Sequence, residues 1–539
     1  MQKYMLSLKA QNELAFFNNG LLFEIFSFQQ LICYLFVRLC FQFIYICRKC
    51  YLQSIIQHIM NIKWLIGAIS VGLFISCENV KEAQTVSNSY PSVFPDYTFT
   101  AIPYNIAPLN FEVKGAQEIR ADFAGEGVNL LTVTGKHEVR IPKKKWKEML
   151  DKLKDKDLEI TVSVWNSSSP EGVRYKPFTV RVASDAIDEW IAYRLIEPGY
   201  EGWNMLGIYQ RNLTSFEEKE IATNRADKSK CMNCHSFANY SPQQMIFHVR
   251  GEGGGTALWK DGELSKLPLE TTGPKKSGTY PMWHPNGRYI VFSSNLTRQS
   301  FLSEGEKALE VYDLQSDLIL YDTQTKKVLT DKRFMDEAHW ETFPAWSADG
   351  KSLYYCGALP KNMPIDYQNL HYSLCKVDFD EATGTFGERI DTIYNAERDG
   401  GSVSFPRLSP DGRYLLYTKA ACATFPIWHK EADLKMLRLS DGEELDVKIL
   451  NSAETESYHS WSSNGRWILF SSRRLDGRYT RLFFAWMDEK GNIHKPFLLP
   501  QSTVEHNVLR TKSYNIPEFI KGEVTLLQKQ LNALFFPQK

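Results

Sequence analysis

Two cysteines and a histidine stand at a spacing that could hold a metal-bearing cofactor: Cys231, Cys234 and His235, in the run KCMNCHSF. Two thiols three residues apart can add to the two vinyl groups on one edge of a porphyrin, and the histidine that follows can ligate the iron. Cys-x-x-Cys-His is therefore the attachment signature of haem c. The sequence predicts covalent haem c on Cys231 and Cys234, with His235 as the proximal ligand of the haem iron.

Other uses of the same motif have to be weighed against haem. A zinc site would need a second pair of cysteine or histidine ligands, and none follows at a suitable spacing. A thioredoxin-like dithiol would need a βαβ context, which the surrounding sequence does not offer. A chance occurrence stays open in a chain of 539 residues.

A repeated motif follows the CMNCH segment and indicates what positions it. Each copy has an aromatic residue, a bulky residue, a turn that ends in Asp-Gly or Asn-Gly, and an apolar strand. The copies leave room for four strands each, which is typical of a β-propeller. They are YPMWHPNGRYIVFSS (280–294), FPAWSADGKSLYYCG (343–357), FPRLSPDGRYLLYTK (405–419), YHSWSSNGRWILFSS (458–472) and a degraded copy, FANYSPQQMIFHVRG, that starts at Phe237.

The pattern P-x-W-S-P-D-G-[KR] in these copies resembles the TolB-type propeller repeat, a relative of the WD-repeat blades. The resemblance covers about residues 236–500 and implies a propeller of a type that often has six blades. Five copies are counted, so we expect five or six blades. The chain as a whole resembles Bacteroidetes lipoproteins that join a CxxCH segment to a TolB-like propeller, which implies an envelope location and no particular reaction.

The distal ligand of the haem iron is predicted to be His459, which stands where the other copies have proline. It is expected at the same end of an inner strand as Ala238 in the degraded copy. Bis-histidine ligation would give a low potential, a methionine ligand would raise it, and an open position would permit ligand binding. The weaker candidates are His248, His284, His339, Met205 and Met282.

The first residues differ in composition from the rest of the chain. Residues 1–59 are rich in Leu, Phe, Ile and Cys, but Glu24 and Arg38 interrupt the apolar run. We interpret them as a non-native leader upstream of a start at Met60, with a transmembrane helix as the alternative.

Residues 60–77 have the features of a lipoprotein signal peptide. Lys63 supplies the positive charge, an apolar stretch follows, and a small residue precedes Cys77, where lipid would be attached. An ordinary signal peptide with an incidental cysteine is the alternative.

The remainder of the chain is expected to be mainly β, with a five- or six-bladed β-propeller preceded by a small β-sandwich-like domain. Strand-like alternation fills the sandwich region, with one helix in which Trp146, Met149, Leu150 and Leu153 share a face. DAIDEWIAYRLI and SFEEKEIATN are predicted to be helical, the second opening with a Ser215–Glu218 capping box. The predicted divisions are a tether (78–94), the sandwich (95–184), a helical connector with the haem motif (185–235), the propeller (236–500) and a C-terminal tail (501–539).

Composition and missing motifs exclude several functions. Lys+Arg and Asp+Glu are equal at 63 each, and no basic stripe indicates nucleic-acid binding. There is no GxSxG elbow, no glycine-rich phosphate loop and no catalytic constellation. Beyond the leader, lipid and haem cysteines, Cys356, Cys375 and Cys422 remain, so at most one disulfide can form among them. Cys356 and Cys375 could pair or could be buried thiols.

The sequence favours a membrane-tethered c-type cytochrome on the periplasmic or outer-membrane side, which exchanges electrons with a protein partner docked on the propeller. A non-catalytic propeller scaffold of the envelope is the first alternative. A haem peroxidase or a sensor of small ligands is the second, so enzymatic activity stays undecided.

Overall fold

The computed structural model describes residues 81–197, 205–269, 278–305 and 307–536. The predictions for the leader, Met60 and Cys77 lie outside these residues. Residues 83–539 form one compact unit, and an N-terminal unit ends at Glu82. Within the described ranges, no helix combines the length and the apolar character that crossing a membrane requires.

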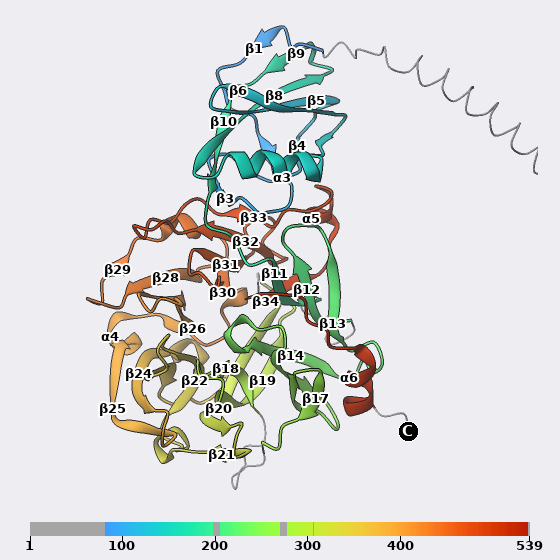
Figure 1. Cartoon of the computed structure of the whole chain (residues 1–539). Helices are drawn as coiled ribbons and strands as arrows, with labels where there is room; N and C mark the ends of the chain where they lie inside the picture. The colour runs from blue at the N-terminus through green and yellow to red at the C-terminus, as the bar shows by residue number, and fades with distance from the viewer. Residues whose placement is uncertain (1–80, 198–204, 270–277, 306, 537–539) are drawn as a thin grey trace, which may run out of the picture. The chain divides into compact units, whose positions relative to one another are not determined.

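The first part of the compact unit contains two sheets and a helix, as expected for the sandwich-like region (Figure 1). Helix α3 (Lys143–Lys152) buries Trp146, Met149 and Leu150, the face that the apolar spacing predicts. The larger sheet contains β1 (Thr85–Val86), β3 (Ala101–Pro103), β5 (Glu118–Gly125), β6 (Val128–Gly135), β8 (Lys156–Asn166), β9 (Ser169–Arg174) and β10 (Phe178–Ala183), and the smaller contains β2 (Val93–Phe94), β4 (Phe111–Val113) and β7 (Glu138–Val139).

The rest of the described chain forms six four-stranded antiparallel sheets, which confirms a mainly β protein with propeller blades. The second sheet has β14 (Cys231–Phe237), β15 (Gln244–Arg250), β16 (Gly255–Lys260) and β17 (Glu263–Lys266); the third has β18 (Thr279–Trp283), β19 (Tyr289–Phe301), β20 (Leu309–Asp322) and β21 (Lys327–Leu329). The fourth has β22 (Trp340–Trp346), β23 (Ser352–Ala358), β24 (Ser373–Asp380) and β25 (Thr385–Tyr394). The fifth has β26 (Ser402–Leu408), β27 (Tyr414–Ala420), β28 (Asp433–Arg438) and β29 (Glu444–Leu445); the sixth has β30 (Glu456–Trp461), β31 (Trp467–Ser472), β32 (Arg481–Trp486) and β33 (Phe497–Leu498).

The first sheet is built from both ends of the propeller sequence. It contains β11 (Trp190–Ile196), β12 (Gly207–Asn212), β13 (Glu218–Thr223) and, from the C-terminal region, β34 (Ser513–Ile520), which pairs with β11. The described residues of the predicted tail, 501–536, therefore do not form a separate tail, because β34 is a strand of a blade. The inner strands of the six sheets contact one another in a closed ring, in the order β14, β18, β22, β26, β30, β34 and back to β14.

The predicted helical connector is wrong, because β11, β12 and β13 are strands. Six of the seven residues of β11 are buried, so apolar residues occupy both faces of the strand. A short apolar run of this kind has no periodicity that separates a buried strand from a helix. Glu218, the expected capping-box residue, instead binds Arg510 through its carboxylate.

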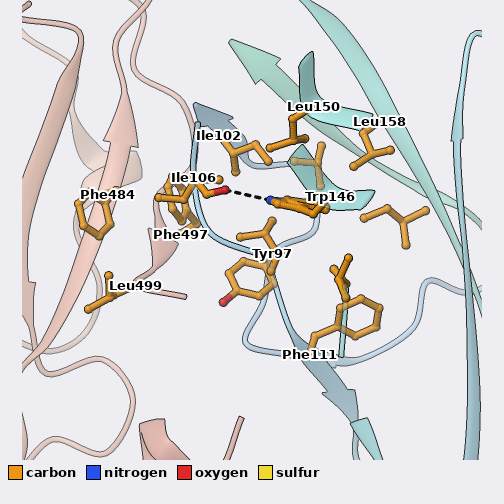
Figure 2. Close-up of a cluster of buried hydrophobic side chains, with 14 of the residues drawn as sticks. Tyr97, Ile102, Ile106, Phe111, Trp146, Leu150, Leu158, Phe484, Phe497 and Leu499 are labelled. Atoms are coloured by element: carbon orange, nitrogen blue, oxygen red, sulfur yellow. Dashed lines mark hydrogen bonds between the residues drawn. The ribbon is translucent and has the colours of Figure 1, made fainter. Parts of the chain in front are cut away.

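The helices outside the sandwich are short: α4 (Ala396–Asp399), α5 (His506–Leu509), α6 (Gln528–Phe535), and the 3₁₀ turns η1 (Ala238–Tyr240), η2 (Lys332–Phe334), η3 (Tyr367–Asn369), η4 (Pro426–Trp428) and η5 (Lys448–Leu450). One hydrophobic core contains residues of the sandwich and of the sixth sheet. Figure 2 shows part of it, with Trp146 donating a hydrogen bond from Nε1 to the carbonyl oxygen of Ile106 at 3.0 Å. Trp146 is 1% exposed, so this bond satisfies a carbonyl inside an apolar core.

We expect Trp146→Phe to lower the free energy of unfolding by about 1–3 kcal/mol, because the Ile106 carbonyl loses its donor in a dry environment. Urea titration followed by circular dichroism measures the change. Lys144→Ala, at an exposed position of the same helix, should change it by less than about 0.5 kcal/mol. Equal midpoints for wild type and Trp146→Phe would contradict the role given to this bond.

Candidate functional site

The inner strand of each of the six sheets has the same bulge. In each bulge, two residues of the inner strand lie opposite one residue of the neighbouring strand. The first of the two has a positive φ between 48° and 53° in all six strands, and it is not glycine in any of them. Bulges of this kind re-aim side chains. The six residues, here called the channel ring, are Cys234, Tyr280, Phe343, Phe405, Tyr458 and Ile516.

The aromatic members of the channel ring pack against one another. The ring centroids of Tyr280 and Phe343 are 4.6 Å apart, those of Phe343 and Phe405 are 4.0 Å apart, and those of Phe405 and Tyr458 are 4.7 Å apart. One cavity is lined by Tyr280, Tyr458 and Ile516 of the ring. A second is lined by residues that follow the bulges, among them Trp283, Trp346 and Trp461. The channel ring therefore separates two cavities.

The haem motif lies on β14, within the propeller rather than before it. Cys231, Cys234 and His235 are each 2% exposed, and both cysteines are free thiols. Cys231 lines the first cavity, where Arg194 Nη2 lies 3.3 Å from its Sγ. Burial raises the pKa of the Cys234 thiol. The two thiols thus belong to the cavity wall and to the channel ring.

The bulge also corrects the alignment of the degraded repeat. The pair Cys234-His235 occupies the place of Tyr280-Pro281 in the third sheet. The aromatic position is therefore filled by Cys234 and not by Phe237, three residues later. The copy was misaligned because a small residue replaces the aromatic one and leaves no local signal.

His235 and His459 are equivalent residues, since each follows the ring residue of its own strand. His459 Nε2 lies 3.0 Å from the carbonyl oxygen of Leu416 on the neighbouring sheet, so this ring is bonded across the seam between two blades. Neither ring nitrogen of His235 has a hydrogen-bond partner of normal geometry, although the backbone of Ala192 and Ile516 faces the ring. Of the two buried rings, His235 is therefore the one in which neither nitrogen makes a hydrogen bond of normal geometry.

The structure does not bring His459 to His235 as a distal ligand. The strands that carry them, β30 and β14, both neighbour β34, and His459 is engaged with the fifth sheet. The weaker candidates are also placed elsewhere: His248 contacts Thr256, His284 contacts Gly350, and Met282 lines the second cavity. His339 is largely exposed beside Asp336, and Met205 contacts Lys512 through its carbonyl.

Burial controls the charge of the two equivalent histidines. Desolvation, with a nearby arginine in each case, lowers the pKa of His235 and of His459 from 6.5 to about 3. Both rings are therefore neutral at physiological pH. A neutral imidazole is the form that ligates a metal.

The cavity beside Cys231, here called the arginine-lined cavity, has a volume of about 110 Å³. Arg194, Arg250 and Arg473 line it together with apolar and aromatic side chains of β19, β20 and η4. Sequence analysis missed these arginines, because they lie on three separate sheets and share no local motif. The only signal was that Arg473 directly follows the apolar strand of a repeat copy.

The donor types suit haem c, since two free thiols and a histidine without hydrogen bonds of normal geometry lie on one strand, but only Cys231 lines the arginine-lined cavity. The volume of about 110 Å³ is below the roughly 300–1,000 Å³ of typical cofactor pockets. A porphyrin therefore requires side chains around Cys231 to move aside, and Arg194 is the one in contact with its sulfur.

The remaining described cysteines are free thiols. Cys356 and Cys375 lie on paired strands, with Cys375 opposite Tyr355 and Cys356 opposite Leu374, so their side chains leave opposite faces of the sheet. They do not form the disulfide that was one of the two possibilities. Within the described ranges, no group of three or more His, Cys, Asp or Glu residues is arranged to hold a metal ion.

Comparison with known proteins finds only partial similarity to solved structures. No family model and no curated protein matches the chain. Similar solved structures include a puromycin-hydrolyzing peptidase of Mycobacterium tuberculosis (11% identity, 64% of this chain and 52% of that one, TM-score 0.34). Another is the periplasmic gluconolactonase of Pseudomonas aeruginosa (13% identity, 61% of this chain and 99% of that one, TM-score 0.33). A third is an oligogalacturonate lyase in complex with manganese (12% identity, 58% of this chain and 74% of that one, TM-score 0.31). The chain spans about half the length of the peptidase.

The neutral burial of His459 predicts acid sensitivity. Its pKa is depressed in the folded chain, so the unfolded chain binds the extra proton between pH 6.5 and about 3, and stability falls as the pH falls through this window. Within this window, His459 lowers the free energy of unfolding by about 1.4 kcal/mol for each pH unit. Because proline stands at the equivalent position of four other inner strands, we expect the His459→Pro variant to fold. It should lose the pH dependence of stability that His459 causes.

Urea unfolding at pH 7.5 and pH 5 measures the effect. At pH 7.5 the variant should be less stable by about 1 kcal/mol, for the lost hydrogen bond to Leu416. At pH 5 the deficit should vanish or reverse. An equal deficit at both pH values would show that His459 does not take up a proton on unfolding.

Proposed function

We propose that the chain is a β-propeller protein that carries covalent haem c on Cys231 and Cys234, with His235 as an axial ligand, and that it transfers electrons outside the cytoplasm. The observation that carries the proposal is the contrast between two equivalent histidines. His459 Nε2 is bonded across its seam, whereas neither buried nitrogen of His235, on the strand of two free thiols, makes a hydrogen bond of normal geometry to the backbone of Ala192 and Ile516 that faces it. Leaving a buried polar side chain unsatisfied costs about 1–3 kcal/mol, which ligation of a metal would offset.

The residues of the motif would act in separate ways. The thiols of Cys231 and Cys234 would provide the two covalent bonds and fix the cofactor to β14. The low pKa of His235, about 3, keeps its imidazole neutral and available to a metal at physiological pH. The haem, once bound, supplies one-electron transfer at a potential set by its ligands and surroundings.

The channel ring would confine the cofactor to one side of the propeller. Phe343, Phe405 and Tyr458 are at most 5% exposed and fill the channel beyond Cys234. Electrons would then leave through the arginine-lined cavity, and a protein partner would dock over its rim. We further propose that a lipid on Cys77 anchors the protein to the cell envelope, on its periplasmic or outer-membrane side.

The proposal predicts covalent haem in the intact chain. After export in cells with a cytochrome c maturation system, a denaturing gel stained for haem should label the wild type and Cys375→Ala, whose thiol is outside the motif. The double variant Cys231→Ala/Cys234→Ala should lose the label, because neither thioether can form. A folded, exported wild type without covalent haem would overturn the proposal and leave a non-catalytic propeller scaffold.

The absorption spectrum of the loaded protein tests the axial ligands. We expect His235→Ala to change the spectrum and His459→Ala to leave it unchanged, because His459 is held in its own blade seam. A change in His459→Ala that matches the change in His235→Ala would restore His459 as the distal ligand. A five-coordinate spectrum in the wild type would instead favour a peroxidase or a sensor of small ligands.

A further inference from the structure

The second cavity, here called the tryptophan-lined cavity, is separated by the channel ring from the cavity beside Cys231. Every inner strand contributes the same two positions to its wall. The second of these positions holds a tryptophan, a phenylalanine or a leucine. The first, two residues after the channel-ring residue, holds Ser236, Met282, Ala345, Arg407, Ser460 or Glu518. The bulge that the six strands share therefore builds one wall from six blades.

Only two of the six residues at the first position are charged, and their charges are opposite. Arg407 on β26 and Glu518 on β34 enter the wall on either side of β30, which contacts both strands. Each stabilises the charged form of the other, but no ion pair joins them within the part of the chain that the structure describes. The guanidinium of Arg407 donates one hydrogen bond there, from Nη1 to the carbonyl oxygen of Pro406 at 3.1 Å. The wall thus has one positive and one negative group that are not bonded to each other.

Ser460 lies between the two charged residues in the order of the ring. It is 8% exposed, and its Oγ has no hydrogen-bond partner among the described residues. Buried polar side chains are normally hydrogen-bonded, so this hydroxyl indicates a polar molecule in the cavity.

The rest of the wall is largely apolar. Trp283, Trp346 and Trp461 are at most 6% exposed. The Nε1 atoms of Trp346 and Trp461 are bonded to carbonyl oxygens of the preceding sheet, so these rings offer carbon edges for contact. Apolar walls with a few polar groups are usual in sites for small molecules. The cavity has a volume of about 240 Å³, that of about eight water molecules, which limits the occupant to a small molecule.

We infer that the tryptophan-lined cavity binds a small amino acid in its zwitterionic form. Arg407 pairs with the carboxylate, because two parallel N–H donors of a guanidinium match two carboxylate oxygens. Glu518 accepts hydrogen bonds from the ammonium, Ser460 supplies a further polar contact, and an apolar side chain lies against the tryptophan edges.

The protonation of Glu518 is compatible with this assignment. Burial raises its pKa to about 8, with the charge of Arg407 opposing the rise. An ammonium group beside the carboxyl would favour the ionised form further. The site does not depend on haem, which the proposed function assigns to the other side of the channel ring.

Three molecules that share a branched apolar group test the two charges. They are L-valine, isovalerate, which lacks the ammonium, and isobutylamine, which lacks the carboxylate. Calorimetric titration of the full chain at pH 8.5, above the pKa of Glu518, and at constant ionic strength should show binding of L-valine. Isovalerate and isobutylamine should each bind at least about tenfold more weakly, because each loses one charged hydrogen bond.

Substitutions in the wall assign each charge to its partner. Glu518→Gln should weaken L-valine binding at least about tenfold and remove the preference for L-valine over isovalerate. Arg407→Gln should weaken it to a similar extent and remove the preference for L-valine over isobutylamine. Arg389→Gln, at an arginine that is 86% exposed on β25, is the matched control and should bind L-valine like the wild type. Circular dichroism without ligand checks that each variant folds, and if one does not, the other variant and the three molecules still decide.

Three results would overturn the amino-acid site. One is a folded wild type that binds none of L-alanine, L-valine and L-leucine. Another is equal binding of L-valine by the wild type and both wall variants, because the amino acid would then bind elsewhere. The third is isovalerate or isobutylamine bound as tightly as L-valine, because only one charge would then be recognised. The haem-free variant Cys231→Ala/Cys234→Ala should bind L-valine like the wild type, so failure of the proposed function would leave this site intact.

Discussion

The antiparallel pairing of β34 with β11 holds the two ends of the propeller sequence together, and the channel depends on it. β34 is an inner strand, so it supplies one member of the channel ring, Ile516, and the cavity residue Asn515. β11 supplies Arg194. Without β34, β11 would be the edge strand of its sheet, with unpaired backbone groups. The geometry around Cys231 is therefore a property of the closed ring rather than of β14 alone.

The bulge on each inner strand gives two successive residues different roles. Its first residue points to the channel, where four strands place an aromatic ring, and β14 places the thiol of Cys234. Its second residue is proline in four strands and histidine in β14 and β30. The CxxCH spacing thus fits the geometry of the blade without any local distortion peculiar to this strand. β14 differs from the other inner strands in its chemistry: the Cys234 thiol replaces an aromatic side chain, and His235 lacks the hydrogen bond that His459 makes.

Much of the fold could be predicted from local patterns. The turns before Gly287, Gly350, Gly412 and Gly465 and the apolar strands after them identify the blades, and the spacing from Trp146 to Leu153 identifies α3. The first blade could not be predicted, because β11 is buried on both faces and its partner β34 lies far along the chain. The motif residues of the candidate site were visible from spacing, whereas the arginines around them depend on contacts between separate sheets. The sequence alone does not show that His235 and His459 are equivalent, because this depends on the bulge that β14 and β30 share.

The burial of the motif sets an order of events in the life of the chain. Cys231 and Cys234 are 2% exposed in the closed ring, so under the proposed function an enzyme that joins haem to them would have no access to either sulfur after folding. In a chain that leaves the cytoplasm with its N-terminus first, β14 emerges long before β34. Between those two moments the thiols of the segment would be reachable. Cofactor insertion and ring closure would then compete in time, and a chain that folds too fast would trap itself without its haem.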